Sequence, residues 1–150
     1  MEIIKKETVV NASLKRVFDY LENPANWPEF WSSLVTVSEV QPLPDGGYKA
    51  NYQYKMAGRL FNGKGEYINY VPNQRIVIST KGGILSKLTF TFRSIPEKTN
   101  SQQTRITLTV EYEIPIPLLG KFAEIIIRKM NEQDIELLMA NLNARFLLSY

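Results

Sequence analysis

The chain has 150 residues, of which 44% are hydrophobic and 22% charged, and its formal net charge is +3 at pH 7. These values predict a single globular domain over residues 1–150 that buries its core without disulfides or metals, and they exclude a disordered chain. The mild charge does not favour nucleic-acid binding. No apolar run is long enough to span a bilayer and the N-terminus lacks a signal-peptide core, so we expect a cytoplasmic protein.

The sequence contains neither cysteine nor histidine. Without cysteine, thiol nucleophiles, disulfides and thiolate metal sites are excluded. Without histidine, the chain lacks the usual general base near neutral pH and the commonest metal ligand. Any chemistry would therefore rely on carboxylates, tyrosine, lysine, arginine or bound water, and we expect neither a metal nor a cofactor.

The first 31 residues predict one strand and two short helices. Residues 2–10 favour extended structure, and Asn11 or Ser13 can cap the helix that follows. That helix has one apolar face at helical spacing, made of Leu14, Val17, Phe18 and Leu21. Pro24 ends it and suits the first position of the next helix, because proline disfavours helix in the residue before it. The second helix carries three large aromatic residues: Trp27, Phe30 and Trp31.

From about residue 34 to residue 114, apolar and polar side chains alternate, as in half-buried antiparallel strands. Glycine, proline and asparagine clusters divide this stretch into six strands. The clearest inward-facing sets are Tyr48, Ala50, Tyr52, Tyr54 and Met56, then Ile84, Leu88, Phe90 and Phe92, then Ile106, Leu108, Val110, Tyr112 and Ile114. Gly63 and Gly65 lie within another strand, where glycine indicates strong bending or close packing against a bulky group.

A long helix closes the chain, and its apolar residues form two stripes. The first stripe is Leu119, Phe122, Ala123, Ile126 and Met130, which helical spacing extends to Asp134, Leu137 and Asn141. The second is Ile135, Leu138, Leu142 and Phe146. We therefore expect a helix that bends near residues 131–134 or is buried on more than one face.

The apolar start of this helix has two interpretations. It contains Leu118, Leu119, Ile125, Ile126 and Ile127 beside Lys121, Arg128 and Lys129. Such a stretch is either core on two sides or a surface that touches a membrane transiently while lipid is exchanged.

This order of elements resembles the START/pollen-allergen (SRPBCC) superfamily, and within it the polyketide cyclase/dehydrase and coenzyme-Q-binding branch. The matching residues are Val17-Phe18-Asp19-Tyr20-Leu21, Trp27-Pro28-Glu29-Phe30-Trp31, Gly63-Lys64-Gly65-Glu66 and Pro117-Leu118-Leu119-Gly120-Lys121. The resemblance implies an α+β helix-grip (START-like) fold: a seven-stranded curved antiparallel sheet wrapped around the long C-terminal helix, with two short helices between strands 1 and 2. Its members include lipid carriers, hormone receptors, cyclases, quinone-binding proteins and chaperone activators, so the fold does not fix the function.

The inward side of the predicted sheet is unusually rich in tyrosine. A buried hydroxyl must find a partner or face a wet cavity. One interpretation is a pocket for an elongated or ring-bearing apolar ligand that a few phenols orient; the other is that several hydroxyls lie in solvent near strand ends. The predicted ligand-binding residues are Tyr48, Tyr52, Tyr54, Met56, Phe61, Tyr67, Leu88, Phe90, Phe92, Leu108, Tyr112, Phe122, Ile126, Met130, Asp134 and Asn141. Trp27, Phe30 and Trp31 are predicted as a gate or as a plug at one end.

Three function classes follow. The preferred one is binding or transport of a small hydrophobic ligand such as a lipid, an isoprenoid quinone or a polyketide-like compound. The second is a cyclase/dehydratase enzyme in which Asp134 and one of Tyr52, Tyr54 or Tyr112 act as acid or base. If the terminal helix bends, Asp134 instead points to water. The third is an interaction module of the chaperone-activator kind, in which the cavity is incidental.

Overall fold

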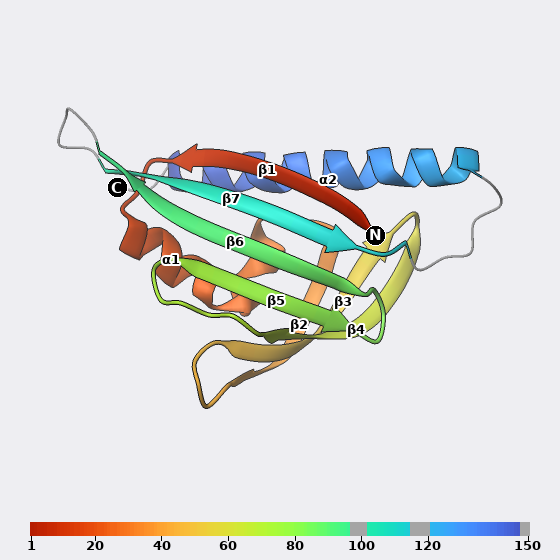
Figure 1. Cartoon of the computed structure of the whole chain (residues 1–150), viewed down its shortest axis with the longest axis horizontal. Helices are drawn as coiled ribbons and strands as arrows, with labels where there is room; N and C mark the ends of the chain where they lie inside the picture. Colours follow the sequence, from red (N-terminus) through yellow and green to blue (C-terminus); the bar gives the residue numbers. More distant parts are fainter. Residues whose placement is uncertain (97–101, 115–120, 148–150) are drawn as a thin grey trace.

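The computed structural model describes residues 1–96, 102–114 and 121–147. Its elements in chain order are β1 (Glu2–Val10), α1 (Leu14–Glu22), the 3-10 helix η1 (Pro24–Glu29), β2 (Leu34–Pro42), β3 (Tyr48–Met56), β4 (Arg59–Tyr67), β5 (Arg75–Lys81), β6 (Ser86–Ile95), β7 (Gln103–Tyr112) and α2 (Lys121–Leu147). The strands form one seven-stranded antiparallel sheet in the order β1-β7-β6-β5-β4-β3-β2 (Figure 1). Among the described residues, no helix is long and apolar enough to cross a membrane.

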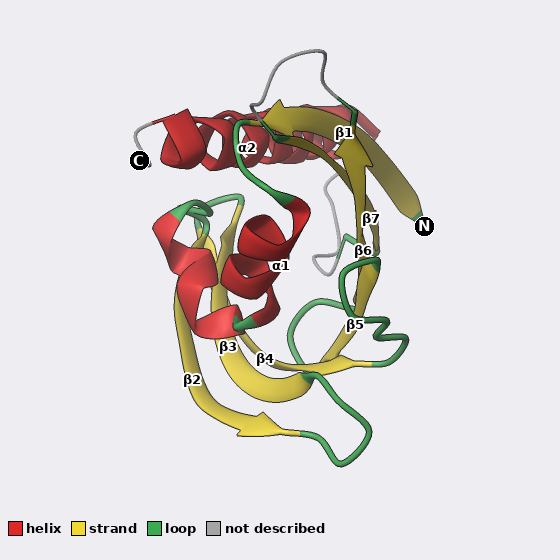
Figure 2. Ribbon diagram, turned by 90° about the vertical axis from the view of Figure 1, so that its left-hand side faces the viewer, coloured by secondary structure: helices red, strands yellow, loops and turns green. Residues whose placement is uncertain are grey.

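The sheet curls strongly, and its concave side holds the helices. Figure 2 shows α1 inside the curve and α2 lying across the open side, next to β1. This arrangement confirms the predicted helix-grip fold, with seven strands and two short helices between the first strand and the second.

The two short helices begin where the sequence indicates. The Ser13 side chain accepts a hydrogen bond from the Arg16 backbone N–H at the start of α1, and Val17, Phe18 and Leu21 are buried. The Asn23 side chain does the same for the Ala25 backbone N–H at the start of η1. These side-chain acceptors satisfy backbone groups that a helix end leaves unpaired. The two caps fix where α1 and η1 begin, and η1 carries the buried Trp27.

Rows of inward-facing residues cross the sheet from strand to strand. The first row has small side chains on four neighbouring strands and ends at a tyrosine on β7: Ala50, Gly65, Thr80, Ser86 and Tyr112. The second row is larger: Tyr67, Ile78, Leu88, Val110 and Ile4. The third row, fully buried, is Ile76, Phe90 and Leu108. Because the register aligns the small residues, one strip of the inner face is left unfilled.

α2 buries a single face along its whole length. That face is made of Ile127, Asn131, Ile135, Leu138, Met139, Leu142 and Phe146. The predicted second stripe is therefore right, whereas the first is displaced by one residue. Ile126 and Met130 are 48% and 47% exposed, so they do not face the sheet. Neither predicted alternative holds, since α2 continues unbroken as one helix (Figure 1) and buries one face rather than several.

The apolar start of α2 is only partly core. Ile127 is buried, whereas Ile125 and Ile126 are exposed. Leu118 and Leu119 lie outside the described residues. Burial on two sides is thus wrong for residues 125–127, and membrane contact stays a prediction.

The two edges of the sheet are protected differently. At β1, the Lys6 ammonium lies 3.2 and 3.0 Å from the carboxylates of Glu132 and Glu136, which ties the edge to α2. At β2, the register with β3 shifts twice, between Leu34 and Thr36 and between Ser38 and Gln41. Glu39 lies within the second irregularity with a φ of 52°, in the left-handed region.

Candidate ligand cavity

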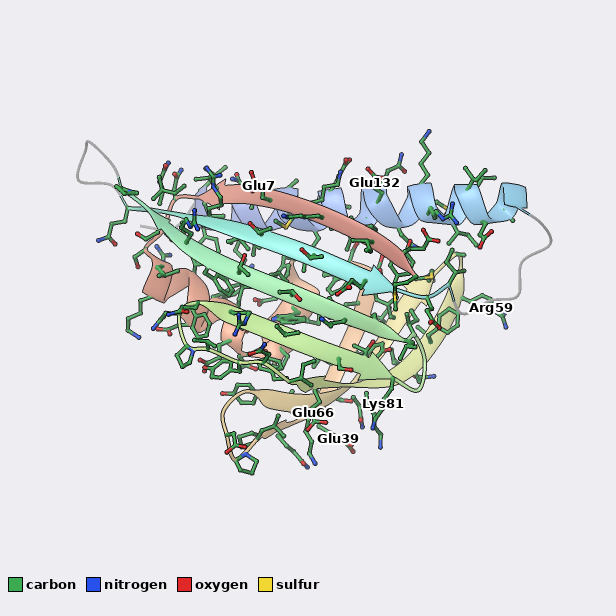
Figure 3. All side chains as sticks on the ribbon, viewed as in Figure 1. Glu7, Glu39, Arg59, Glu66, Lys81 and Glu132 are labelled. Atoms are coloured by element: carbon green, nitrogen blue, oxygen red, sulfur yellow. The ribbon has the colours of Figure 1, made fainter. Side chains whose placement is uncertain are left out.

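A cavity of about 100 Å³ lies between the sheet, η1 and α2. Its floor is formed by the first two residue rows of the sheet, and Ile135 and Asn131 reach it from α2. The wall is almost entirely apolar, and none of the described residues that line it carries a charge. Glu66 of β4 and Lys81 of β5, on two of the strands that form the floor, are exposed and do not line the cavity (Figure 3).

The structure brings many of the predicted binding residues together around this cavity. Those that line it are Tyr48, Tyr52, Tyr54, Met56, Tyr67, Leu88 and Tyr112, with Trp27 and Trp31 of the predicted gate. Phe30 is buried but does not line the cavity. Whether any of them binds a ligand stays a prediction.

Other predicted residues lie elsewhere. Phe90, Phe92 and Leu108 belong to the packed core, because the sheet register places them beyond the small row. Phe61 is only partly buried and, like the solvent-exposed Ile126 and Met130, is not part of the cavity wall. Asn141 donates a hydrogen bond to the Phe30 carbonyl at 3.2 Å. The side chain of Phe122 lies outside the described part of the structure.

Sequence reasoning missed several wall residues. They are Ile4, Pro24, Leu34, Val37, Ala50, Gly65, Ile78, Thr80, Ile84, Ser86, Val110, Asn131 and Ile135. Alternation placed Ala50, Ile84 and Val110 on the inner face, but it could not show which inner positions border a void. That distinction depends on cross-strand register.

Three of the five phenols in the described wall donate hydrogen bonds to the protein. The Tyr67 hydroxyl donates to the Glu22 carbonyl at 2.6 Å, and the Tyr52 hydroxyl donates to the Ile84 carbonyl at 3.3 Å. The Tyr54 hydroxyl donates to Asp134 Oδ2 at 2.8 Å. These tyrosines therefore present ring faces to the cavity and direct their hydroxyls into the wall.

Asp134 forms a clasp outside the cavity rather than a group within it. Its carboxylate accepts hydrogen bonds from Trp31 Nε1 at 3.0 Å, from Tyr54 at 2.8 Å and from the Ser33 hydroxyl at 2.6 Å. Burial raises the pKa of Tyr54 well above its ordinary value of 10.0, and the neighbouring carboxylate raises it further. The clasp joins α2 to β3 and to the segment after η1, and Asp134 borders an open hollow on the far side.

Both indoles of the predicted gate are held in place. Trp27 Nε1 donates to the Leu21 carbonyl at 2.9 Å, and its ring meets Phe90 edge-on with centroids 5.3 Å apart. Trp31 is held by Asp134 and meets the Tyr54 ring at 5.4 Å. The two rings therefore form fixed walls of the cavity in this structure.

One glycine of β4 makes room for a tyrosine ring. Gly63 pairs directly with Tyr52 on β3. A Cβ at Gly63 would lie 2.5 Å from the Tyr52 ring, so any side chain there would force the ring to shift. At Gly65, by contrast, the nearest atoms would be 3.4 and 3.7 Å away, at ordinary contact distance. The glycine at 63 therefore serves close packing, and that at 65 leaves space in the floor of the cavity.

The model of the polyketide cyclase/dehydrase and lipid transport family matches residues 1–146. The chain belongs to this family. Among solved structures it is similar to the Zhui aromatase/cyclase from a Streptomyces species, with a TM-score of 0.72 and 11% identity over 97% of this chain and 93% of that one. It is also similar to a START superfamily protein from Mycobacterium smegmatis, with a TM-score of 0.71 and 16% identity over 97% of each chain. A protein from Thermus thermophilus has a TM-score of 0.68 and 20% identity over 97% of each chain.

No curated protein matches the sequence significantly. At the identities of the structural neighbours, the likeness establishes the fold and leaves activity to the site itself. In this member of the polyketide cyclase/dehydrase and lipid transport family, the candidate site is an apolar cavity whose described wall includes five tyrosines and two tryptophans among aliphatic and small side chains. Within the described residues, no group of three or more acidic side chains could hold a metal ion.

Proposed function

We propose that this protein binds and carries a small apolar molecule that contains a ring, in the cavity between the sheet and α2. The observation that carries the proposal is the chemistry of the wall: tyrosine and tryptophan rings around a space with no charged lining residue among those described. Apolar walls with a few polar groups are typical of small-molecule sites, and burial of the ligand's apolar surface would supply the affinity.

The size of the cavity limits what fits. A volume of about 100 Å³ is of the order of a single aromatic ring, since engineered cavities of roughly 150 Å³ bind benzene. Pockets for larger ligands measure about 300–1,000 Å³. A longer ligand would therefore need α2 or the β3–β4 hairpin to move outward.

The geometry favours binding over a cyclase/dehydratase reaction. Such a reaction needs an acid or base within hydrogen-bond reach of the substrate. Asp134 does not line the cavity, and three donors from the protein already surround its carboxylate. The hydroxyls of Tyr52 and Tyr54 are likewise engaged within the wall, and burial raises the pKa of Tyr112, which makes its phenol a weaker acid. Carriage of a ligand requires none of these groups to react.

The test uses the two tryptophans, the only ones in the chain, because both line the cavity. Titration with toluene should shift the NMR signals of both indole N–H groups in a saturable way. Ala50→Leu places a larger side chain in the floor and should weaken toluene binding at least tenfold. Ala140→Leu, the same exchange at an exposed position of α2, is the matched control and should leave binding unchanged.

The proposal fails if neither indole responds to toluene, or if Ala50→Leu binds it as tightly as the parent protein. Native mass spectrometry of the freshly purified protein, followed by organic extraction, then identifies any natural cargo. A released ring-bearing apolar compound would support carriage.

A further inference from the structure

One polar side chain interrupts the apolar inner face of α2. Asn131 is only 8% exposed and stands between Ile127 and Ile135, one turn away on either side. Helical spacing predicts an apolar residue at position 131. An amide that is buried beside an apolar cavity loses hydrogen bonds to water. Asn131 therefore brings hydrogen-bonding groups to an otherwise apolar face of α2.

Asn131 has one hydrogen-bond partner within the described residues. Its Nδ2 donates to the hydroxyl oxygen of Tyr112 at 3.1 Å. An asparagine side chain has two donors and a carbonyl oxygen, and a phenol can donate as well as accept. The Tyr112 hydrogen and the Asn131 carbonyl oxygen thus have no acceptor or donor among the described residues, although Tyr112 is only 3% exposed.

A second polar group at the cavity behaves differently. The Thr80 hydroxyl donates to the Ile84 carbonyl at 2.7 Å and also lies against the Ser86 hydroxyl. The Tyr52 hydroxyl meets both the carbonyl and the N–H of Ile84. The hydroxyls of Thr80 and Tyr52 are thus already bonded within the wall, so they have little hydrogen-bonding capacity left for a ligand. Among the buried side chains of the described wall, the residual hydrogen-bonding capacity is at Tyr112 and Asn131.

We infer that the Tyr112–Asn131 pair recognises one oxygen atom of the ligand, a carbonyl or hydroxyl attached to its ring-bearing apolar body. The inference deepens the proposed function and rests on it. Tyr112 ends the row of small residues that forms the cavity floor. A ligand lying along this row has one end at the Tyr112 hydroxyl, which donates to its oxygen, while its ring covers Ser86 and Gly65.

Two further observations agree with this assignment. The Tyr112 phenol is protonated and a donor at neutral pH, as its ordinary pKa of 10.0 requires, and burial raises that pKa further. Asn131 and Met56 are the two residues shared by the cavity wall and the open hollow outside. The polar end of the ligand would thus lie next to the side from which water reaches the wall.

The experiment compares benzyl alcohol with ethylbenzene, which differ by the exchange of a hydroxyl for a methyl group. Dissociation constants of both are measured by indole NMR titration in the parent protein, in Tyr112→Phe and in Asn131→Leu. Ethylbenzene is the more hydrophobic probe, so the informative quantity is the ratio of the two constants. Each variant should weaken benzyl alcohol relative to ethylbenzene by roughly three- to tenfold, the size of one net hydrogen bond. Tyr52→Phe removes a hydroxyl that the wall already satisfies and should leave the ratio unchanged.

The outcomes separate the two proposals. If both probes bind and the ratio is the same in Tyr112→Phe as in the parent, this inference is overturned while the proposed function stands. If neither probe binds, the proposed function fails, and the inference falls with it. Tyr112→Phe keeps the ring and its packing, so a loss confined to benzyl alcohol reports the hydroxyl rather than a folding defect.

Discussion

Residues on the inner face of β6 lie in two different environments, the packed core and the cavity wall. Phe90 and Phe92 meet the rings of Trp27 and Phe18 edge-on, with centroids 5.3 Å apart in each pair, and form solid core. Leu88, two residues earlier on the same face, is equally buried but borders the cavity. The difference is not hydrophobicity. It arises from the residues that lie beside each position on the neighbouring strands. The row that contains Phe90 has large side chains, whereas the row next to Leu88, which contains Ser86, has small ones.

Replacing a large side chain with alanine in each environment should give the largest difference in stability. Phe90→Ala should lower the free energy of unfolding by about 4 kcal/mol, because it opens a new void in packed core. Leu88→Ala should cost only about 2 kcal/mol, at the low end for leucine, since it enlarges an existing space. Urea denaturation measures both. Equal costs would show that the two interiors are packed alike.

The glycines of β4 offer a sharper version of the same comparison. Gly63→Ala forces a methyl group against the Tyr52 ring and should destabilise the protein by about 1–3 kcal/mol, as overpacking does. Gly65→Ala adds the same methyl group at the cavity floor and should change stability by less than about 1 kcal/mol, in the favourable direction. Thermal unfolding distinguishes them. If Gly65→Ala is the more harmful exchange, the strip beside it is not open.

The sequence was sufficient for the outline of this molecule because its signals are local. Alternation, caps and Pro24 place the strands and the two short helices correctly. Alternation also identifies inner positions such as Tyr48 and Leu88, which do line the cavity. It fails for Phe90 and Leu108, because hydrophobic residues beside a void and residues in solid core have the same pattern.

The errors on α2 have a related cause. The predicted stripe through Ile126 and the buried stripe through Ile127 are offset by one residue. The buried stripe contains the polar Asn131, so its sequence is less apolar than that of the predicted one. The residue that misled the prediction is the one to which we assign ligand recognition. Asp134, chosen as a catalytic candidate for its apparent inward position, is instead held by donors from β3 and the segment after η1.

A further expected effect is confined to alkaline pH and concerns the stability that the buried Tyr54 phenol contributes. Because burial raises the pKa of Tyr54 in the folded protein above the ordinary 10.0, the unfolded chain loses this proton first. The stability it contributes is complete below pH 10 and is lost as the pH rises from there towards the higher folded pKa. Tyr54→Phe should flatten the decline in unfolding free energy above pH 10 by up to about 1.4 kcal/mol per pH unit.

Urea denaturation between pH 9 and pH 11 measures this slope in both proteins. Other groups titrate in the same range, but they are common to the parent and the variant and cancel in the comparison. An identical slope in Tyr54→Phe would mean that the phenol is not shielded in the folded state.

The irregular edge at β2 bears on how copies of this protein behave at high concentration. An open strand edge is a template on which another chain can add a strand and begin aggregation. Here two register shifts interrupt the edge. Glu39 places a carboxylate and a left-handed backbone conformation there, and Pro42 has no backbone N–H to donate. A protein whose sheet must stay curved and partly hollow thus carries, at the sheet edge opposite β1, a safeguard against joining its neighbours into fibres.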